Sequence, residues 1–297
     1  MQRDPSHAEG RVVEHLGKGF MVETMAGETV FCNANRRLSA ITGDKVVCDP
    51  AQQRIVGVLP RTSVLARPLP NGKNKPFAAN IDQLIIVFAI RPKYDFLLVD
   101  QYLTLCENQA LKAQLVLNKS DLLSSDTEAC DLQKQIAIYR RLHYPVHVLS
   151  TKSGAGIEGL VPCFKERSSL FVGQSGVGKS SLANIFLPDA NIRVNTLSKS
   201  TARGRHTTTT SRLYRLPHGG NLIDTPGVSI FGLADINEEH LLEGYRELAC
   251  YRSQCRFRNC KHLDDQGCAI RAAVEDGAIS PDRYQRFLKL RDKLLPG

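Results

Sequence analysis

The sequence predicts an α/β fold in three parts: a small β-barrel, an α/β core and a short helical domain. Three observations predict this arrangement. Short segments of alternating polarity fill residues 11–59, two loop patterns of the core come in an unusual order at 118–121 and 173–180, and four metal-ligand side chains crowd into residues 255–268. With 297 residues and 42% hydrophobic content, the chain can form two or three small domains.

The barrel is predicted from five strand-like segments separated by Gly, Asn and Asp turns, at 11–14, 19–23, 28–32, 44–48 and 54–59. Their number and length are typical of an OB-type β-barrel, which we assign to residues 1–68. Such barrels often bind single-stranded nucleic acid, and they also serve as inert scaffolds. Because its aromatic side chains are few, Phe20 and Phe31, recognition of backbone or shape is favoured over base stacking. The Pro- and Gly-containing stretch 61–80 predicts a linker.

A phosphate-binding loop is indicated by GQSGVGKS at 173–180, which fits GxxxxGK[ST] and follows the buried-strand pattern 169–172. Its glycines let backbone amides turn inward around phosphate oxygens, and the helix that follows points its positive end at the same anion. Lys179 adds a point charge for the β and γ phosphates, and the Ser180 hydroxyl is placed to ligate Mg²⁺. A plain strand-to-helix connection would not require this full spacing. The expected contacts are Gly173, Gln174, Ser175, Gly176, Val177, Gly178, Lys179, Ser180 and Ser181.

Guanine recognition is indicated by NKSD at 118–121, which fits NKxD and follows a strand pattern at 113–117. The Asp121 carboxylate can accept from both N1–H and the exocyclic amine of guanine. Adenine would leave that carboxylate unpaired, at a cost of about 1–3 kcal/mol or more. Asn118 would bind the other edge of the base, and the Lys119 stem would cover the base and ribose.

Two further segments complete the expected nucleotide site. A strand pattern at 146–149 leads into a loop typical of those whose backbone amide binds guanine O6, formed by Ser150, Thr151 and Lys152. DTPG at 224–227 fits DxxG; Asp224 would hold Mg²⁺, through water, and Gly227 would contact the nucleotide. Ordinary GTPases have the order phosphate loop, DxxG, NKxD. Here NKxD comes first, so the sequence predicts a circularly permuted P-loop GTPase core over residues 79–235.

The residue that positions the attacking water is less evident. Ras-like enzymes use a Gln shortly after DxxG, but Gly227 is followed here by the apolar Val228. His206 lies beside threonines expected to close on Mg²⁺ and the γ-phosphate, and its imidazole can exchange a hydrogen bond with water. We therefore expect His206, Lys179 and Thr208 to be catalytic, with Thr208 also a magnesium ligand. The alternative is that His206 contacts an RNA phosphate together with its arginine neighbours.

Charge and composition indicate an intracellular protein with an anionic partner. The net charge is +9, and residues 190–223 contain no Asp or Glu but several Lys and Arg. A basic run is usually a solvated face, but beside two candidate RNA-binding modules it favours phosphate contacts. The polar N-terminus and the short apolar run 84–90 indicate neither export nor a membrane anchor. We expect a cytoplasmic monomer.

A metal site is predicted from Cys255, Cys260, His262 and Cys268, a short span that can surround a tetrahedral Cys₃His zinc ion. The site would be structural, because no coordination position stays open. Cys250 is a competitor for one position, although we expect it to be a free buried thiol. Five other cysteines lack ligand spacing and are expected in the core: Cys32, Cys48, Cys106, Cys130 and Cys163. Ser280 and Pro281 then begin a basic amphipathic helix that reaches about Leu295, within a helical domain over residues 236–297.

In this order, the motifs resemble the ribosome small-subunit-dependent GTPase A (RsgA) family over nearly the whole chain. The resemblance rests on NKSD, GQSGVGKSS, DTPG, GRHTTT and CRFRNCKHLDDQGC. It implies a bacterial factor that binds the small (30S) ribosomal subunit and its rRNA late in assembly. It also implies hydrolysis of GTP to GDP and phosphate when the subunit stimulates it.

Two other functions fit parts of the sequence. One is an RNA-binding module whose guanine nucleotide is regulatory and not hydrolysed; Asp224 beside the basic stretch argues against it. The other is a small-molecule P-loop kinase, against which NKxD and the absence of an obvious acceptor-binding insertion argue. Because 84–89 has the pattern of the strand that ordinarily follows DxxG, the permutation connects DxxG directly to the metal-binding domain, and we expect nucleotide state to act on that domain.

Overall fold

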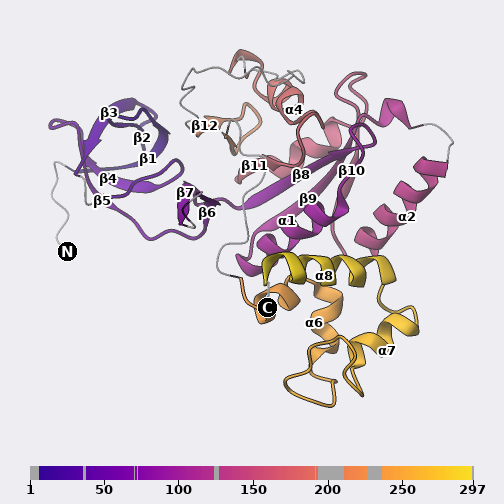
Figure 1. Ribbon diagram of the computed structural model, residues 1–297. Coiled ribbons are helices and arrows are strands. Elements are labelled where there is room, and N and C mark those ends of the chain that lie inside the picture. The colour runs from indigo at the N-terminus through magenta and orange to yellow at the C-terminus, as the bar shows by residue number, and fades with distance from the viewer. Residues whose placement is uncertain are drawn as a thin grey trace.

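The computed structural model describes residues 7–35, 38–69, 71, 73–123, 127–190, 192, 211–225 and 236–295. Figure 1 shows a barrel beside a sheet flanked by helices, with a helical part packed below that sheet. Within these ranges, no helix combines the length and the apolar character needed to cross a membrane.

The barrel consists of β1 (Ala8–His15), β2 (Phe20–Thr24), β3 (Thr29–Ala34), β4 (Lys45–Asp49) and β5 (Arg54–Val58). The strands pair in the order β1-β2-β3-β5-β4, and β4 returns to pair with β1, which closes the barrel. Alternate side chains point inward, as the period of two requires, so that Val12, Val22, Val46 and Ile55 have no exposed surface. The five predicted strands are all present, with their ends shifted slightly.

The predicted linker at 61–80 is wrong. Two strands, β6 (Val64–Pro68) and β7 (Asn74–Ala79), form an antiparallel hairpin between the barrel and the core sheet, as Figure 1 shows. Its inner side chains Leu65 and Ala78 are buried in the core hydrophobic cluster. Pro76 is tolerated because both strands of a two-stranded sheet are edges.

The core sheet has five parallel strands in the order β10-β9-β8-β11-β13. They are β8 (Gln83–Ala89), β9 (Lys112–Asn118), β10 (Val146–Val148), β11 (Ser168–Val172) and β13 (Asn221–Asp224). A sixth strand, β12 (Arg212–Arg215), runs antiparallel to β13 and pairs on its other side with β1 of the barrel. Every residue of β8 and β11 is buried, as expected for strands covered on both faces.

Helices cover both faces of this sheet. Side chains of α1 (Phe96–Asn108) and α2 (Thr127–Arg141) lie in one hydrophobic cluster, and those of α3 (Val161–Phe164) and α4 (Lys179–Phe186) lie in the other. Asp95 begins α1 as an N-cap, because its side chain accepts from the amides of Leu97 and Leu98. Three short 3₁₀ turns complete the core: η1 (Ser120–Leu122), η2 (Glu158–Leu160) and η3 (Pro188–Ala190).

The C-terminal part contains α5 (Glu238–Glu243), α6 (Arg246–Arg252), α7 (Ala269–Glu275) and α8 (Pro281–Leu294), which share a hydrophobic cluster of their own. The predicted helix start at Ser280 and Pro281 is confirmed, with Ser280 at the N-cap position. In Figure 1, α8 lies along the underside of the core.

A buried ionic cluster fixes α8 to the core. Arg283 of α8 has no exposed surface and pairs with Asp100 of α1 (2.5 Å) and with Glu247 of α6 (2.6 Å). Arg286 also pairs with Asp100, at 2.6 Å. Removing one partner from such a buried pair costs about 3–5 kcal/mol, because the other charge stays buried. The cluster therefore ties the C-terminal helices to the helix that follows β8.

Candidate functional site

The segments predicted to bind nucleotide meet at one edge of the core sheet. Asn118 ends β9, Gly173 follows β11, Asp224 ends β13, and the loop at 150–152 follows β10. These four strands are parallel, so their carboxyl ends lie on the same edge, where α/β sheets bind ligands. Chain segments far apart in sequence thus form one candidate site.

The loop at 173–178 depends on glycine at two positions. Gly173 has φ +136°, and a Cβ there would lie 2.0 Å from the carbonyl oxygen of Val87. Gly178 has φ +99°, and a Cβ there would lie 2.2 Å from the side-chain amide of Asn118. Both positions therefore exclude other residues, on backbone conformation and on space. The remaining loop residues, Gln174, Ser175, Gly176 and Val177, lead into the first turn of α4, which contains Lys179, Ser180 and Ser181.

The Lys179 ammonium is held against this loop. Its Nζ donates to the carbonyl oxygens of Gly173 (2.8 Å) and Gln174 (2.6 Å). Burial lowers the pKa of Lys179 to about 8, because the charged form loses hydration. An anionic phosphate at this loop would favour the protonated form.

Asn118 joins the three loops of the site. Its side chain is fully buried; Nδ2 donates to the carbonyl of Val177 (2.8 Å), and Oδ1 accepts from the backbone amides of Lys119 (2.7 Å) and Thr151 (3.1 Å). Lys119 reaches the phosphate loop as well, because its Nζ donates to the carbonyl oxygen of Gly176 at 2.7 Å. Asn118 therefore fixes the phosphate loop relative to the loops expected to bind the base.

Asp121 is exposed and has a hydrogen-bonding partner that the sequence did not reveal. The Ser150 hydroxyl donates to Oδ1 of Asp121, and Ser150 Oγ accepts from the backbone amide of Lys152 at 3.2 Å. The Ser150 hydrogen bond, above all, lowers the pKa of the Asp121 carboxyl. The carboxylate is therefore ionised at neutral pH, as an acceptor for the guanine N1–H must be.

The metal-facing side of the site is described in part. Asp224 is partly buried at the end of β13, and burial raises the pKa of its carboxyl. A divalent cation would offset this cost by stabilising the ionised form. The other residues expected there, His206, Thr208, Gly227 and Val228, lie outside the described residues.

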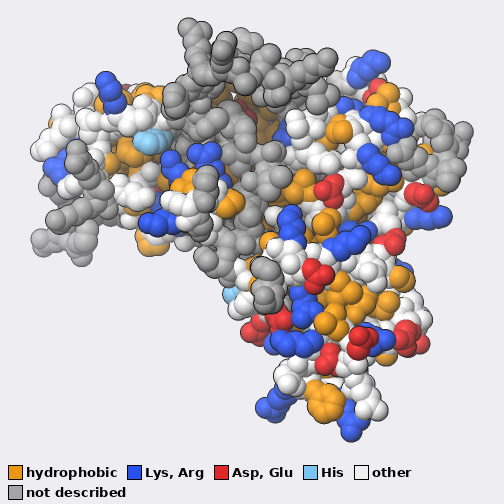
Figure 2. Space-filling model, in the orientation of Figure 1, with side chains coloured by type: hydrophobic (Ala, Val, Ile, Leu, Met, Phe, Trp, Pro, Cys, Tyr) orange, Lys and Arg blue, Asp and Glu red, His pale blue; other side chains and the backbone are white. Residues whose placement is uncertain are grey.

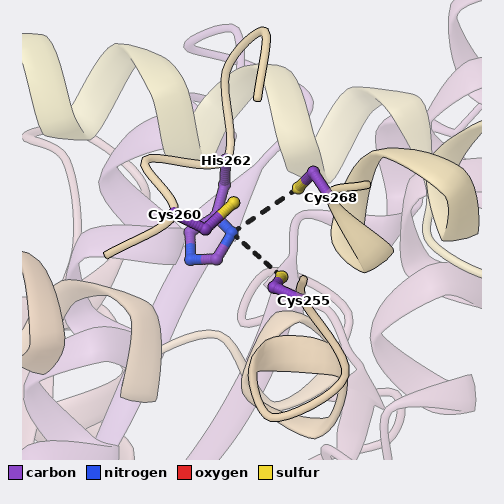
Figure 3. A group of neighbouring side chains, drawn as sticks. All are labelled: Cys255, Cys260, His262 and Cys268. Carbon is purple, nitrogen blue, oxygen red and sulfur yellow. Dashed lines mark hydrogen bonds between the residues drawn. The ribbon is translucent and has the colours of Figure 1, made fainter. Parts of the chain in front are cut away.

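The predicted metal ligands form a second site, in the C-terminal part. Figure 3 shows Cys255, Cys260, His262 and Cys268 converging from different segments, and their ligand atoms all lie within 4.8 Å of one another. Nδ1 of His262 lies 3.6 Å from the sulfur atoms of both Cys255 and Cys268. His262 adopts φ +58°, a strained backbone that turns its ring toward the sulfurs. This cluster could hold a metal ion.

Two predictions about the remaining cysteines are wrong. Cys250, expected as a buried thiol, is exposed and is not part of the cluster, and Cys130, expected in the core, is exposed on α2. Cys163 is only partly buried, whereas Cys32, Cys48 and Cys106 are buried as predicted. The short spacing of a metal motif was informative, whereas the burial of single cysteines on helices depends on how each helix packs.

Comparison with known proteins agrees with this architecture. The chain is 43% identical over 294 residues to the small ribosomal subunit biogenesis GTPase RsgA of Haemophilus influenzae, covering 96% of this chain and 85% of that protein. The corresponding protein of Dickeya dadantii is 42% identical over 296 residues, with 96% and 84% covered.

Two solved structures share the fold. YjeQ from Thermotoga maritima has a TM-score of 0.80 and 32% identity, with 98% of this chain and 99% of that chain covered. YloQ, a circularly permuted GTPase, has a TM-score of 0.77 and 26% identity, with 99% and 98% covered. They confirm the predicted fold class, a permuted P-loop core between an OB-type barrel and a helical domain with a Cys₃His cluster. The model of the RsgA GTPase family matches residues 58–234, and the chain therefore belongs to this family of GTP-hydrolysing enzymes.

Proposed function

We propose that the chain binds the small (30S) ribosomal subunit, hydrolyses GTP to GDP and phosphate when the subunit stimulates it, and acts in late maturation of that subunit. The observation that carries the proposal is the meeting of NKSD and the phosphate loop at one sheet edge, joined through Asn118. The names of the bacterial relatives, which match almost the entire chain, support the ribosomal role. We infer a cytoplasmic, monomeric enzyme.

In the proposed complex, the base is bound by Asn118, Lys119 and Asp121 together with the loop of Ser150, Thr151 and Lys152. The phosphates are bound by residues 173–181, with Gly227 near the γ-phosphate. Mg²⁺ would be held by Ser180, Thr208 and Asp224; the partly buried Asp224 carboxylate supports this assignment. Lys179 would stabilise charge on the transferred phosphoryl group, and His206 would position the attacking water.

The metal of the second site would be zinc. Three thiolates and an imidazole form a donor set that zinc binds tetrahedrally, and the ligand atoms already lie close enough to share one ion. With all four positions taken by protein, the ion would be structural. Zinc would fix the loop between Cys255 and Cys260, since both ends of this loop would be ligands.

That loop has features of an RNA-binding surface. Phe257 is 46% exposed between Arg256 and Arg258, and the Arg256 guanidinium lies 5.3 Å from its ring centroid. Neighbouring cations such as Lys261 and Arg252 are paired with Glu238 and Glu239, whereas neither Arg256 nor Arg258 has an ion-pair partner among the residues that the structure describes. Figure 2 shows hydrophobic surface between basic side chains at this end of the molecule. An exposed aromatic ring beside unpaired arginines suits an unpaired base and its phosphates.

A tryptophan can report on this contact, because the chain contains none. We expect the emission of Phe257→Trp to be quenched by a single-stranded oligoribonucleotide, and Phe257→Ala to lower RNA affinity about tenfold, since stacking contributes about 1–3 kcal/mol per base. Leu263→Trp is the matched control, because Leu263 is 38% exposed in the same metal-binding segment. Equal quenching at both positions, or unchanged RNA affinity of Phe257→Ala, would contradict base stacking.

The parts of the chain are proposed to be domains with boundaries at 1–68, 79–235 and 236–297. Separate hydrophobic clusters for the barrel and the C-terminal helices support these boundaries. The hairpin of β6 and β7 belongs energetically to the core, since Leu65 and Ala78 are buried there.

The proposed function is tested by GTP turnover of the wild-type chain alone, with free rRNA and with purified small subunits. We expect a slow basal rate, and a rise of at least about tenfold with small subunits, because a bound partner can complete an active site that is otherwise incomplete. Large subunits serve as the control. A rate that small subunits do not change would refute stimulation by the subunit, and absence of any turnover would favour a regulatory, non-hydrolysed nucleotide.

A further inference from the structure

Strand β12 belongs to the barrel and to the nucleotide-binding core at the same time. Its first residue, Arg212, lies opposite Asp224 of β13 on one side and opposite Glu14 of β1 on the other. Asp224 is the carboxylate proposed to hold Mg²⁺. A single residue of β12 therefore separates a barrel strand from the metal-facing end of the nucleotide site.

The contact that fixes the start of β12 is made by Thr42 of the barrel. Thr42 is 2% exposed, and its Oγ1 donates to the carbonyl oxygen of Ser211 at 2.8 Å. Ser211 immediately precedes β12. Since the hydroxyl is shielded from water, no solvent molecule can readily replace this hydrogen bond.

The loop that carries Thr42 is itself fixed in place. The Ala79 amide donates to the carbonyl of Thr42 at 2.9 Å, and the Asn80 side chain donates to the carbonyl of Gly43 at 3.0 Å. Gly43 has φ +92°, and a Cβ there would lie 2.2 Å from the carbonyl oxygen of Ala79. Asp44, fully buried, accepts two hydrogen bonds of 2.7 Å from Arg61. A displacement of this loop would therefore act on Ser211 through Thr42.

The other polar contacts between the barrel and β12 are weaker. Arg212 pairs with Glu14 at 3.5 Å and Arg215 with Glu23 at 2.7 Å, but the two arginine side chains are 54% and 66% exposed. Exposed ion pairs are screened by solvent and salt and contribute little. The buried Thr42 hydrogen bond is thus the contact best suited to hold β12 in one position.

We propose that Thr42 is a positioning residue for GTP hydrolysis: it ties Ser211 and β12 to the barrel, so that a partner docked on the barrel changes the position of β12 beside Asp224. The proposed function supplies the identity of that partner, the small subunit. Coupling of this kind requires that the partner favours one position of β12 over another.

The test compares Thr42→Val, which keeps the shape and removes the hydroxyl, with Thr42→Ser, which keeps the hydroxyl. Single-turnover GTP hydrolysis is measured with and without saturating small subunits, and subunit binding is measured by co-sedimentation. We expect Thr42→Val to lose about fivefold of the stimulated rate, with the basal rate, the KM for GTP and subunit binding within about twofold of wild type. Thr42→Ser should restore the stimulated rate.

Thr104→Val is the matched control, because the buried Thr104 hydroxyl donates to the carbonyl of Asp100 within α1, at 3.0 Å, and does not touch β12. Hydrogen exchange of the free protein gives a second readout that needs no ribosome: residues 211–215 should exchange faster in Thr42→Val than in Thr104→Val. Equal exchange in the two variants, or full stimulation of folded Thr42→Val, overturns the role of Thr42. Absence of stimulation in the wild type would instead count against the proposed partner.

Discussion

Asp121→Asn is expected to weaken GTP binding about 100-fold or more and to admit xanthosine triphosphate. The carboxylate is proposed to accept two hydrogen bonds from guanine, and a hydrogen bond to a charged group contributes about 1.5–3 kcal/mol, where 1.4 kcal/mol is a tenfold change in affinity. An amide can donate to the extra carbonyl of xanthine, which a carboxylate would repel. Isothermal titration with both nucleotides, at fixed Mg²⁺, measures the exchange of preference.

The control for this exchange is Asp131→Asn, which removes the same charge from an exposed position on α2, where Asp131 lies 3.6 Å from Lys134. Its nucleotide affinities should equal those of the wild type. If Asp121→Asn kept wild-type GTP affinity and gained nothing for the xanthine nucleotide, NKSD would not be the segment that binds the base. The Ser150 hydrogen bond to Asp121 would then have only a structural role.

His206→Ala is expected to lower subunit-stimulated single-turnover hydrolysis about 100-fold while subunit binding stays intact. A group that exchanges a proton or hydrogen bond with the attacking water typically contributes about 10²–10⁴-fold. The apolar Val228 after DxxG supports this assignment, because its side chain cannot orient water. Rapid mixing with preformed complexes of enzyme, GTP and subunit isolates the chemical step.

The control is His218→Ala, because His218 is an exposed histidine of the same basic region, in the turn between β12 and β13. Its hydrolysis rate should stay within about twofold of wild type. Weakened subunit binding with normal turnover of the bound enzyme would assign His206 to an RNA contact instead. An unchanged rate with unchanged binding would remove both roles.

Features set by short stretches of sequence were predictable. The barrel strands follow from side-chain alternation, which reflects the two-residue period of a strand with one buried face. The phosphate loop follows from glycines at 173 and 178, where backbone angles and the proximity of Val87 and Asn118 exclude any side chain. The metal cluster follows from ligand types held within 255–268, where few chain conformations separate them.

Features that depend on contacts between distant residues were not predictable in this way. The hairpin of β6 and β7 has the Pro and Gly content of a linker, and only burial of Leu65 and Ala78 against the core makes it ordered sheet. Arg283 has the sequence context of a solvated helix face, yet Asp100 and Glu247 neutralise it in the interior. Neither partner is near Arg283 in sequence.

By itself, the sequence determined which chemistry the chain carries: the phosphate loop, the base-binding segment, the metal ligands and the rotated order that marks the permuted core. Each of these depends on residue types at fixed short spacings, which constrain local geometry directly. Only the tertiary structure decided how the parts are joined, through Asn118 between the loops, Asp100 beneath α8 and Thr42 against Ser211. These contacts form between residues that are far apart in the chain, so their geometry is set by the packing of whole elements.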